Sequence, residues 1–330
     1  MKSSLSIAMS LAAVGLTASV LGADIKSKIP DLRETAKLLI DVMPSRMPGS
    51  ENDTPAKIEL GKKLYFDVRL SVNDSQSCNT CHRLDEKRGG VDNEPTSQGA
   101  HGQRGNRNSP TVLNAGFYIA QFWDGRAKDL VEQAKGPVLN PVEMAMPSEP
   151  EVVKKLSAIK EYQDLFAKAF PTETEKITYD NIARAIAAFE RTLITYDRFN
   201  DFLKGDDKAL TDKELEGLEL FINTGCTTCH NGPAMGGGSF QKVGLINEYK
   251  TEDKGRYDVT KDEDDIGKFK VPSLRNIALT APYFHHGRYK NLADVVKLMA
   301  YHQLDKRLTD AEADTLVAFL KTLTDKERVK

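Results

Sequence analysis

The sequence predicts a mainly α-helical protein with long loops and little β-structure, organised as two similar units. Three observations lead to this prediction. Hydrophobic residues recur at helical spacing in several stretches of the 330-residue chain. Helix-start signals precede two of these stretches. A five-residue pattern that uses all four cysteines occurs once in each half of the chain.

The expected helices follow from apolar spacing and from capping residues. One helix is expected around residues 152–170 and another over 179–195, because apolar residues there recur at helical spacing. Thr211 and Thr309 each begin a Thr-x-x-Glu capping box that precedes a further amphipathic segment. Loops are expected at the runs rich in glycine or proline, which are 89–90, 141–150 and 236–238.

The two five-residue patterns, 78–82 and 226–230, both read Cys-x-x-Cys-His, the attachment sequence of a c-type haem. In that role the two thiols form thioethers with the porphyrin, and the histidine binds the iron. A pair of redox dithiols or half of a zinc site is the alternative, which would leave both histidines idle. We therefore expect two covalently bound haems c and no disulfide. The haem-binding residues would be Cys78, Cys81, His82, Cys226, Cys229 and His230.

Residues 1–23 are expected to be a secretory signal peptide. Lys2 precedes an apolar stretch over residues 5–21, and the first acidic residue is Asp24. An uncleaved membrane anchor is the alternative, but the segment is rich in Ala, Ser and Gly and no stop-transfer flank follows it. Since c-type haem is attached outside the cytoplasm, we expect a periplasmic mature chain with no stable membrane anchor.

Charge and length narrow the possible classes of protein. The chain carries 46 basic and 48 acidic residues, and the basic ones are not bunched, so no nucleic-acid partner is expected. About 307 residues would remain after the signal peptide, enough for two domains with real cores. The polar run 196–207 is the expected boundary. It divides the mature chain into an N-terminal haem domain, 24–195, and a C-terminal haem domain, 196–330.

A weak internal repeat supports this division. Gly61 and Gly217 each begin a Gly-x-x-Leu-aromatic run ahead of a haem motif. The second half then has the order of a cytochrome c domain, namely a helix, the haem motif, a long excursion, a methionine and a closing helix. We therefore expect two cytochrome c-like haem domains.

The sixth iron ligand should distinguish the two haems. A methionine opposite the histidine favours electron transfer, whereas a displaceable ligand permits chemistry. In the second half, Met235 lies too close to the haem motif to reach the opposite face. Met299 lies on a helical pattern at a suitable distance, with ordinary core packing as its alternative role.

In the first half, His101 is the only histidine that follows His82. Its polar, glycine-rich loop has few packed contacts to hold it, so this ligand could leave the iron. An exposed loop histidine with no role at the iron is the alternative.

Several blocks outside the haem motifs occur in a recognisable order. They are 108–114 (NSPTVLN), 121–126 (QFWDGR), 140–146 (NPVEMAM), 271–276 (VPSLRN), 281–285 (APYFH) and 317–323 (VAFLKTL). In these blocks, and over nearly all of the mature chain, the sequence resembles the bacterial di-haem cytochrome c peroxidase family.

The resemblance implies a role for each haem. His82 would bind an N-terminal peroxidatic haem, with His101 as its removable ligand. His230 and Met299 would bind a C-terminal electron-donating haem. One departure concerns the removable histidine, which in the family stands one residue further from the Asn-x-Pro-Thr block, where this chain has Ala100.

The resemblance also implies distal and interdomain residues. Glu143 matches the family's acid–base residue, Gln133 a polar distal neighbour, Trp123 the aromatic residue between the haems, and His285 a histidine near the interdomain region. From the residues alone, Val142 and Met144 would partly shield Glu143, and shielding raises a carboxyl pKa and suits proton transfer. A surface position for Glu143 and a role as core filler for Trp123 are the alternatives.

An interdomain calcium ion is implied at Asn108, Thr280 and Pro282, whose carbonyl and amide oxygens suit that hard cation. By composition, the acidic run 262–265 is the more obvious calcium candidate. It lacks the spaced ligands and the glycine of a dedicated calcium loop, so we interpret it as a solvated loop.

The resulting hypothesis is a periplasmic cytochrome c peroxidase, an oxidoreductase. It would reduce hydrogen peroxide to water with electrons from a small c-type cytochrome or a cupredoxin, and, like family members, would form a homodimer. Glu143 would move the proton. Two alternatives stay open. In a related di-haem oxidase that modifies a partner protein, a tyrosine replaces the methionine ligand, and Tyr301 lies near Met299. A di-haem electron carrier would have no substrate.

Overall fold

The computed structural model describes residues 25–85 and 87–329. The predicted signal peptide, residues 1–23, lies outside the described residues. Within the described residues, no helix is both long and apolar enough to cross a membrane.

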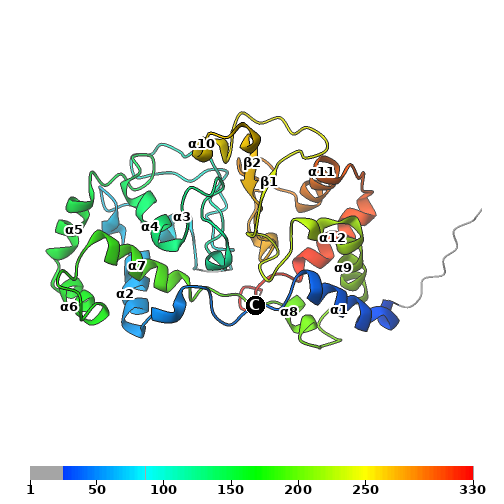
Figure 1. Cartoon of the computed structure of the whole chain (residues 1–330), viewed down its shortest axis with the longest axis horizontal. Coiled ribbons are helices and arrows are strands. Elements are labelled where there is room, and N and C mark those ends of the chain that lie inside the picture. Colours follow the sequence, from blue (N-terminus) through cyan, green and yellow to red (C-terminus); the bar gives the residue numbers. More distant parts are fainter. Residues whose placement is uncertain (1–24, 86, 330) are drawn as a thin grey trace, which may run out of the picture.

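Two helical lobes stand side by side with a loop-rich region between them (Figure 1). The first lobe is built on two helices that pack along each other, α2 (Pro55–Phe66) and α7 (Tyr179–Glu190). Its other helices are α3 (Cys78–Cys81), α4 (Leu130–Leu139), α5 (Glu149–Ser157) and α6 (Lys160–Ala169).

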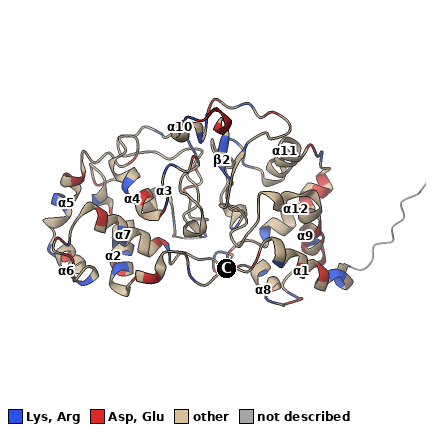
Figure 2. Ribbon diagram, in the orientation of Figure 1, with Lys and Arg blue, Asp and Glu red and all other residues tan. Residues whose placement is uncertain are grey.

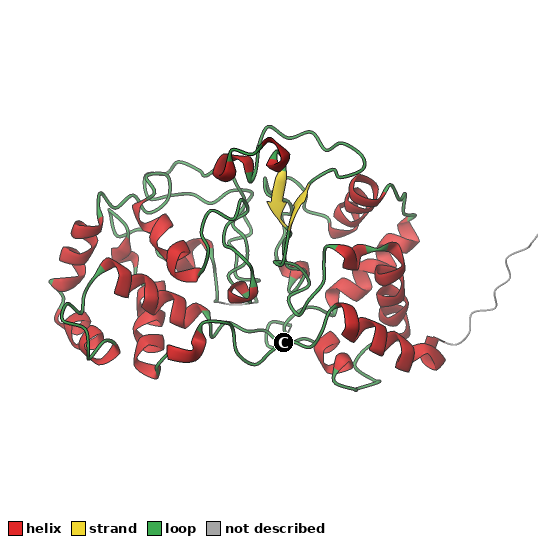
Figure 3. Ribbon diagram, viewed as in Figure 1, coloured by secondary structure: helices red, strands yellow, loops and turns green. Residues whose placement is uncertain are grey.

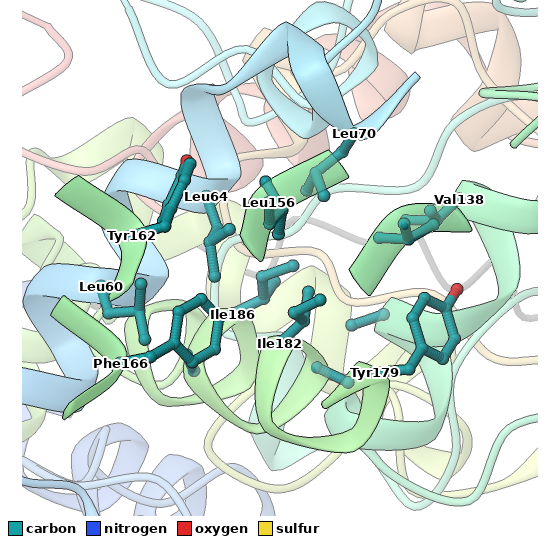
Figure 4. Close-up of a cluster of buried hydrophobic side chains, with 14 of the residues drawn as sticks. Leu60, Leu64, Leu70, Val138, Leu156, Tyr162, Phe166, Tyr179, Ile182 and Ile186 are labelled. Carbon is teal, nitrogen blue, oxygen red and sulfur yellow. The ribbon is translucent and has the colours of Figure 1, made fainter. Parts of the chain in front are cut away.

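The core of the first lobe forms where α2, α6 and α7 present apolar residues four positions apart (Figure 4). Leu60 and Leu64 of α2 meet Ile182 and Ile186 of α7, and all four side chains are buried. Burial of a side chain of this size stabilises the folded state by about 1.5–3 kcal/mol. The predicted helical spacing in residues 179–195 therefore marks a true core face.

Two predicted helices differ from the structure in their extent. The helix expected over 179–195 ends at Glu190, and residues 191–195 form a turn and an extended segment. The helix expected around 152–170 is two helices, α5 and α6, because Ile159 takes an extended conformation between them. Apolar periodicity continues through this break, so spacing alone did not reveal it.

The second lobe contains α8 (Arg198–Leu203), α9 (Asp212–Thr224), α11 (Leu292–Leu304) and α12 (Asp310–Lys321). Both predicted capping boxes are confirmed, since Thr211 and Thr309 each accept a hydrogen bond from the backbone three residues on, and the glutamate returns it. The lobe's core gathers apolar residues of α9 and α12, among them Leu218, Phe221 and Phe319.

The segment 25–40 packs with the second lobe, although the predicted boundary groups it with the first half. It comprises η1 (Ile25–Lys28) and α1 (Ile29–Leu39). Ile29, Leu32 and Ala36 lie on one face of α1 and join the same core as Phe199 and Phe202. Figure 1 shows α1 beside α8 and α9. Sequence order does not reveal this arrangement. The chain begins in the second lobe, runs through a loop to the first lobe, and returns to the second lobe after α7.

The weak glycine repeat has a packing explanation. Gly61 lies where α2 meets α7, and a Cβ there would stand 1.8 Å from the Ala185 carbonyl oxygen. Gly217 lies where α9 meets α12, and a Cβ there would stand 2.4 Å from the Thr315 carbonyl oxygen. Each glycine therefore permits a close helix crossing behind a haem motif.

The region between the lobes is mostly loop (Figure 3), which agrees with the prediction of a helical protein with long loops. Within the described residues the only sheet is one antiparallel pair, β1 (Phe240–Lys242) with β2 (Lys268–Lys270), in which Phe240 faces Lys270. Basic and acidic residues are interspersed over both lobes (Figure 2). The remaining short elements are η2 (Ser50–Asn52), η3 (Val68–Leu70), η4 (Ala115–Phe117), η5 (Cys226–Thr228), α10 (Tyr257–Thr260), η6 (Glu263–Asp265) and η7 (Ile277–Leu279).

Candidate functional site

Each haem motif presents a buried histidine whose ring is fixed by a backbone carbonyl. His82 donates from Nδ1 to the carbonyl oxygen of Pro110 at 3.0 Å. His230 donates from Nδ1 to the carbonyl oxygen of Met235 at 3.3 Å. Burial lowers the pKa of both imidazoles, to about 4 for His230. Both rings are therefore neutral, and the hydrogen bond from Nδ1 places the proton there and leaves Nε2 as the unprotonated nitrogen, the tautomer that a haem ligand requires.

The cysteines lie beside these histidines on short helical turns. Cys78 and Cys81 bracket α3, whose first turn is capped by Ser77, and Cys226 opens η5. Burial raises the pKa of the Cys226 thiol to about 11. The four thiols and two histidines thus fit two covalently attached haems.

A repeated sequence run lies beside the two histidines and was not predicted from the sequence. Pro110 begins the run Pro-Thr-Val-Leu-Asn and Pro272 the run Pro-Ser-Leu-Arg-Asn. The carbonyl of Pro110 accepts a hydrogen bond from His82, and the carbonyl of Pro272 lies near His230 and acts to raise the pKa of its imidazole. Both runs end in an asparagine of positive φ that starts a 3-10 turn. A search for the pattern Pro-(Thr/Ser)-x-x-Asn would have found this repeat.

The repeat continues into a second pair of segments, 121–126 and 283–288. Each has a phenylalanine of positive φ (Phe122 at 65°, Phe284 at 66°) and a glycine of positive φ three residues later. An isolated bridge closes both segments. In this register Trp123 and His285 occupy equivalent positions, one from each half of the chain.

A large cavity extends from the second haem motif to the junction of the lobes. Cys226, Cys229 and His230 line it together with Met299, and Pro110 and Trp123 line its far end. The walls of this cavity are mostly apolar, and both cysteines and the histidine of the second motif line it. These residues suit a covalently bound macrocycle.

The structure separates the candidates for the ligand opposite His230. Met299 lies on α11 and is half-buried against the cavity. The Met235 side chain is fully buried in the second core instead. Tyr301 is not among the cavity-lining residues, and its ring packs against His302 and Arg307.

Glu143 lies in the loop that follows α4, near the first haem motif. Its Oε1 accepts a hydrogen bond of 2.9 Å from Asn140 Nδ2. Burial raises the pKa of this carboxyl, although Arg126 and Asn140 act in the opposite direction. Burial also raises the pKa of the Cys81 thiol to about 11, and the negative charge of Glu143 adds to that rise. The negative charge of Glu143 is therefore close enough to affect Cys81, one of the two cysteines that would attach the first haem. Gln133 is half-buried on α4 in the same lobe.

His101 lies at the turn of a short hairpin, 98–104, and is exposed. The hairpin is docked on the Glu143 loop, because the Ala100 N–H donates to the Glu143 carbonyl at 2.7 Å and Gln103 Nε2 to the Pro141 carbonyl at 2.8 Å. A Cβ on Gly99 would stand 1.9 Å from the Val142 carbonyl oxygen, so the contact needs glycine. The loop expected to be poorly held is thus fixed directly to the segment that carries the predicted acid.

Trp123 and His285 meet at the lobe junction. Their rings pack edge to face, with centroids 6.4 Å apart, and both residues line the cavity. Trp123 Nε1 donates to the Asn108 carbonyl at 2.8 Å. His285 stacks on Phe269 with centroids 4.2 Å apart. Trp123 thus lines the same cavity as His230 and is hydrogen-bonded to Asn108, two residues before the Pro110 that supports His82.

The three residues of the predicted calcium site, Asn108, Thr280 and Pro282, all line the same cavity. Asn108 Nδ2 donates to the carbonyls of Glu94 and Pro95, which orients Oδ1 away from them and leaves it as an acceptor. The acidic run 262–265 is engaged locally, since Asp265 pairs with Lys268 at 3.0 Å. In the described part of the chain, no group of three or more His, Cys, Asp and Glu is arranged to hold a metal ion.

Comparison with known proteins gives a consistent assignment. A family model described as di-haem cytochrome c peroxidase matches residues 55–208, and a cytochrome c model matches residues 215–324. A cytochrome c551 peroxidase of Pseudomonas aeruginosa is 50% identical over 276 residues, which cover 82% of this chain and 79% of that protein. One of Nitrosomonas europaea is 50% identical over 270 residues, 81% of this chain and 79% of that protein. A solved MauG-like protein associated with microbial copper homeostasis superposes with a TM-score of 0.78 at 30% identity, covering 88% of this chain and 95% of that one.

Proposed function

Because this chain belongs to the di-haem cytochrome c peroxidase family, we propose that it reduces hydrogen peroxide to water at the first of its two c-type haems. When bound, the haems supply iron centres that exchange electrons and activate peroxide. The observation that carries the proposal is an asymmetry between the two sites. The first motif adjoins a half-buried carboxyl group, whereas the second opens onto an apolar cavity that also contains a methionine.

We propose that the second site transfers electrons. His230 and Met299 would hold its haem from opposite faces, and the apolar walls would exclude water. Trp123 and His285, in edge contact at the lobe junction, would lie on the path toward the first site.

At the first site, His82 would hold the haem in the orientation set by Pro110. Glu143 would take the proton that peroxide loses at one oxygen and deliver it to the other oxygen, which leaves as water. Its raised pKa suits both directions of transfer, and Asn140 holds the carboxyl in place. Gln133 would assist as a polar neighbour.

We propose that His101 is a removable ligand of the first haem and that its hairpin controls access to the site. The hairpin shares hydrogen bonds with the Glu143 loop, so a movement of one would be felt by the other. A calcium ion at Asn108, Thr280 and Pro282 would hold the lobes together at this level, because these residues come from both halves.

The remaining assignments are also proposals. Residues 1–23 would direct the chain to the periplasm, where a small c-type cytochrome or a cupredoxin would donate electrons, and two copies would form a homodimer. We propose a peroxidatic unit that ends at residue 195 and an electron-transfer unit over 196–330. The electron-transfer unit would also include α1, because residues 25–40 pack in its core.

The test is replacement of the proposed proton carrier. Glu143→Gln keeps the size and the hydrogen bond of the side chain but removes its proton exchange. We expect peroxide turnover, measured by stopped flow with a reduced c-type cytochrome, to fall by about 10²–10⁴-fold.

Glu151→Gln, an exposed glutamate on α5, is the matched control and should turn over at the normal rate. Both variants should carry two haems. Normal turnover in Glu143→Gln would remove this residue from the mechanism, and a wild-type protein with two haems that does not consume peroxide would contradict the proposed function itself.

A further inference from the structure

The internal repeat places Lys270 in a position of special interest. Lys270 stands two residues before Pro272, as Asn108 stands two residues before Pro110. The two backbones make equivalent bonds across the lobe junction. The Asn108 N–H donates to the His285 carbonyl at 2.6 Å, and the Lys270 N–H donates to the Trp123 carbonyl at 2.7 Å. The junction is therefore pseudo-symmetric, and Lys270 is the counterpart of the residue proposed to bind calcium.

The Lys270 side chain is buried at this junction, with only 5% of its surface exposed. Its Nζ lies 4.5 Å from the centre of the Tyr118 ring, a contact that offers partial compensation for a buried cation. None of the described carboxylates forms an ion pair with it. Its strand neighbour Lys268 differs, because it is partly exposed and pairs with Asp265 at 3.0 Å.

Lys270 stands apart in charge from the other described residues that line this cavity. Among the described residues that line it, Lys270 is the only Lys or Arg, and none is Asp or Glu. Burial lowers the pKa of this ammonium to about 8. A buried lysine without an anion is costly, so the site calls for a negatively charged partner.

We infer that Lys270 is a cofactor-binding residue whose ammonium group pairs with a propionate carboxylate of a haem bound in the cavity. The inference rests on the proposed di-haem function. A haem brings two carboxylates on its edge, and the cavity that contains His230 and Met299 also contains Lys270. The ammonium group would then be a positive charge held beside the haem in one half of the junction, as the proposed calcium ion would be in the other. A cation there favours the reduced iron, because the reduced haem carries one more negative charge.

The first experiment measures both haem midpoint potentials by spectroelectrochemistry of the intact two-haem protein. In Lys270→Met, we expect the potential of at least one haem to fall. The expected shift corresponds to about a tenfold change in the ratio of reduced to oxidised haem, or about 59 mV for one electron. Lys270→Arg retains the cation and should recover most of the shift. Lys268→Met, on the same strand, is the control and should match the wild type.

The second experiment needs no variant. With the haems labelled by ¹³C at their propionate carboxyls, infrared spectra of the wild type should show at least one of the four propionates still ionised about one pH unit below an ordinary carboxyl pKa near 4.3. Unchanged potentials in Lys270→Met would overturn the inference. If that variant does not bind both haems, ordinary titration of all four labelled propionates in the wild type would overturn it. Haem content and peroxide turnover of the wild type are measured separately, so loss of the Lys270 inference and loss of the peroxidase function are distinguishable.

Discussion

At the scale of single residues, two glutamates near the first haem motif, one half-buried and one buried, have different surroundings. Glu143 has a hydrogen-bond donor in Asn140 and lies within the influence of Arg126. Glu190, at the end of α7, is buried with its Oε2 lacking a hydrogen-bond partner in the described structure. Burial raises the pKa of Glu190 to about 8. Its charge, when present, would also oppose ionisation of Cys78. Glu190 is therefore a protonated acid at neutral pH.

This protonation predicts a pH-dependent stability. The unfolded chain releases the Glu190 proton near the ordinary pKa of 4.5, whereas the folded protein keeps it up to about pH 8. The folded state is therefore destabilised progressively as the pH rises between these values. Glu190→Gln removes the penalty. We expect it to be about as stable as the wild type at pH 4.5 and more stable at pH 8, by on the order of a few kcal/mol.

Urea unfolding at pH 4.5, 6 and 8 measures this difference. Glu175→Gln, at an exposed glutamate just ahead of α7, is the control and should show no pH-dependent difference from the wild type. A constant difference between Glu190→Gln and the wild type at all three pH values would show that the carboxyl is ionised in the folded protein.

At the scale of elements, the two lobes use the same device to seat a haem motif. A helix carrying a glycine precedes each motif and crosses a later helix at close range, α2 against α7 and α9 against α12. The atoms that meet the glycines are backbone carbonyl oxygens, which cannot turn away as a side chain can. The two helices of each pair can approach this closely only because the glycine lacks a Cβ atom.

The prediction is that Gly61→Ala destabilises the first lobe. The added Cβ would stand 1.8 Å from the Ala185 carbonyl oxygen, so α2 and α7 must separate. Overpacking of this kind costs about 1–3 kcal/mol or more. Gly136→Ala is the matched control, because its Cβ would meet Phe122 at an ordinary 3.5 Å and alanine favours the helix by about 0.5–1 kcal/mol. In thermal unfolding, Gly61→Ala should therefore lower the melting temperature and Gly136→Ala should raise it. Equal shifts in melting temperature would refute the packing explanation.

At the scale of the whole molecule, one arginine ties the halves of the chain together. Arg107, near the predicted calcium residue Asn108, forms a two-bond pair with Asp253 at 2.7 Å and a second pair with Asp124 at 2.5 Å. These partners lie on opposite sides of the predicted boundary. Both pairs are largely buried, so their separation would leave charges without partners.

Arg107→Gln is therefore expected to destabilise the joined state by on the order of 3 kcal/mol and to make the lobes unfold more independently. Although burial opposes it, hydrogen bonding to Arg107 lowers the pKa of Asp253. The wild type should hence lose this stabilisation as the pH falls below the ordinary carboxyl value of about 4, whereas the variant should not. Calorimetry across pH 3 to 7 measures both effects, with the exposed Arg104→Gln as control. A single unfolding transition identical to that of the wild type would contradict this account.

The sequence by itself determined the chemistry and the class of fold. Cys-x-x-Cys-His is a local pattern whose residues must be adjacent, so both haem motifs are legible without a structure. Helical spacing and capping boxes are local as well, which is why the segments beginning at Thr211 and Thr309 were predicted correctly. Spacing after the second motif pointed to Met299, and the resemblance then supplied Glu143 and Trp123. The roles of all three residues stay predictions.

Tertiary structure alone decided which distant segments meet. Residues 25–40 pack with the second lobe, and the His101 hairpin docks on the Glu143 loop, because segments far apart in the sequence come into contact. The break at Ile159 depends on the backbone conformation of that residue. Burial is likewise a property of the assembled molecule. Nothing in the sequence around Lys270 marks this lysine as buried. Its burial away from water and from carboxylates depends on the segments of both halves that pack around it.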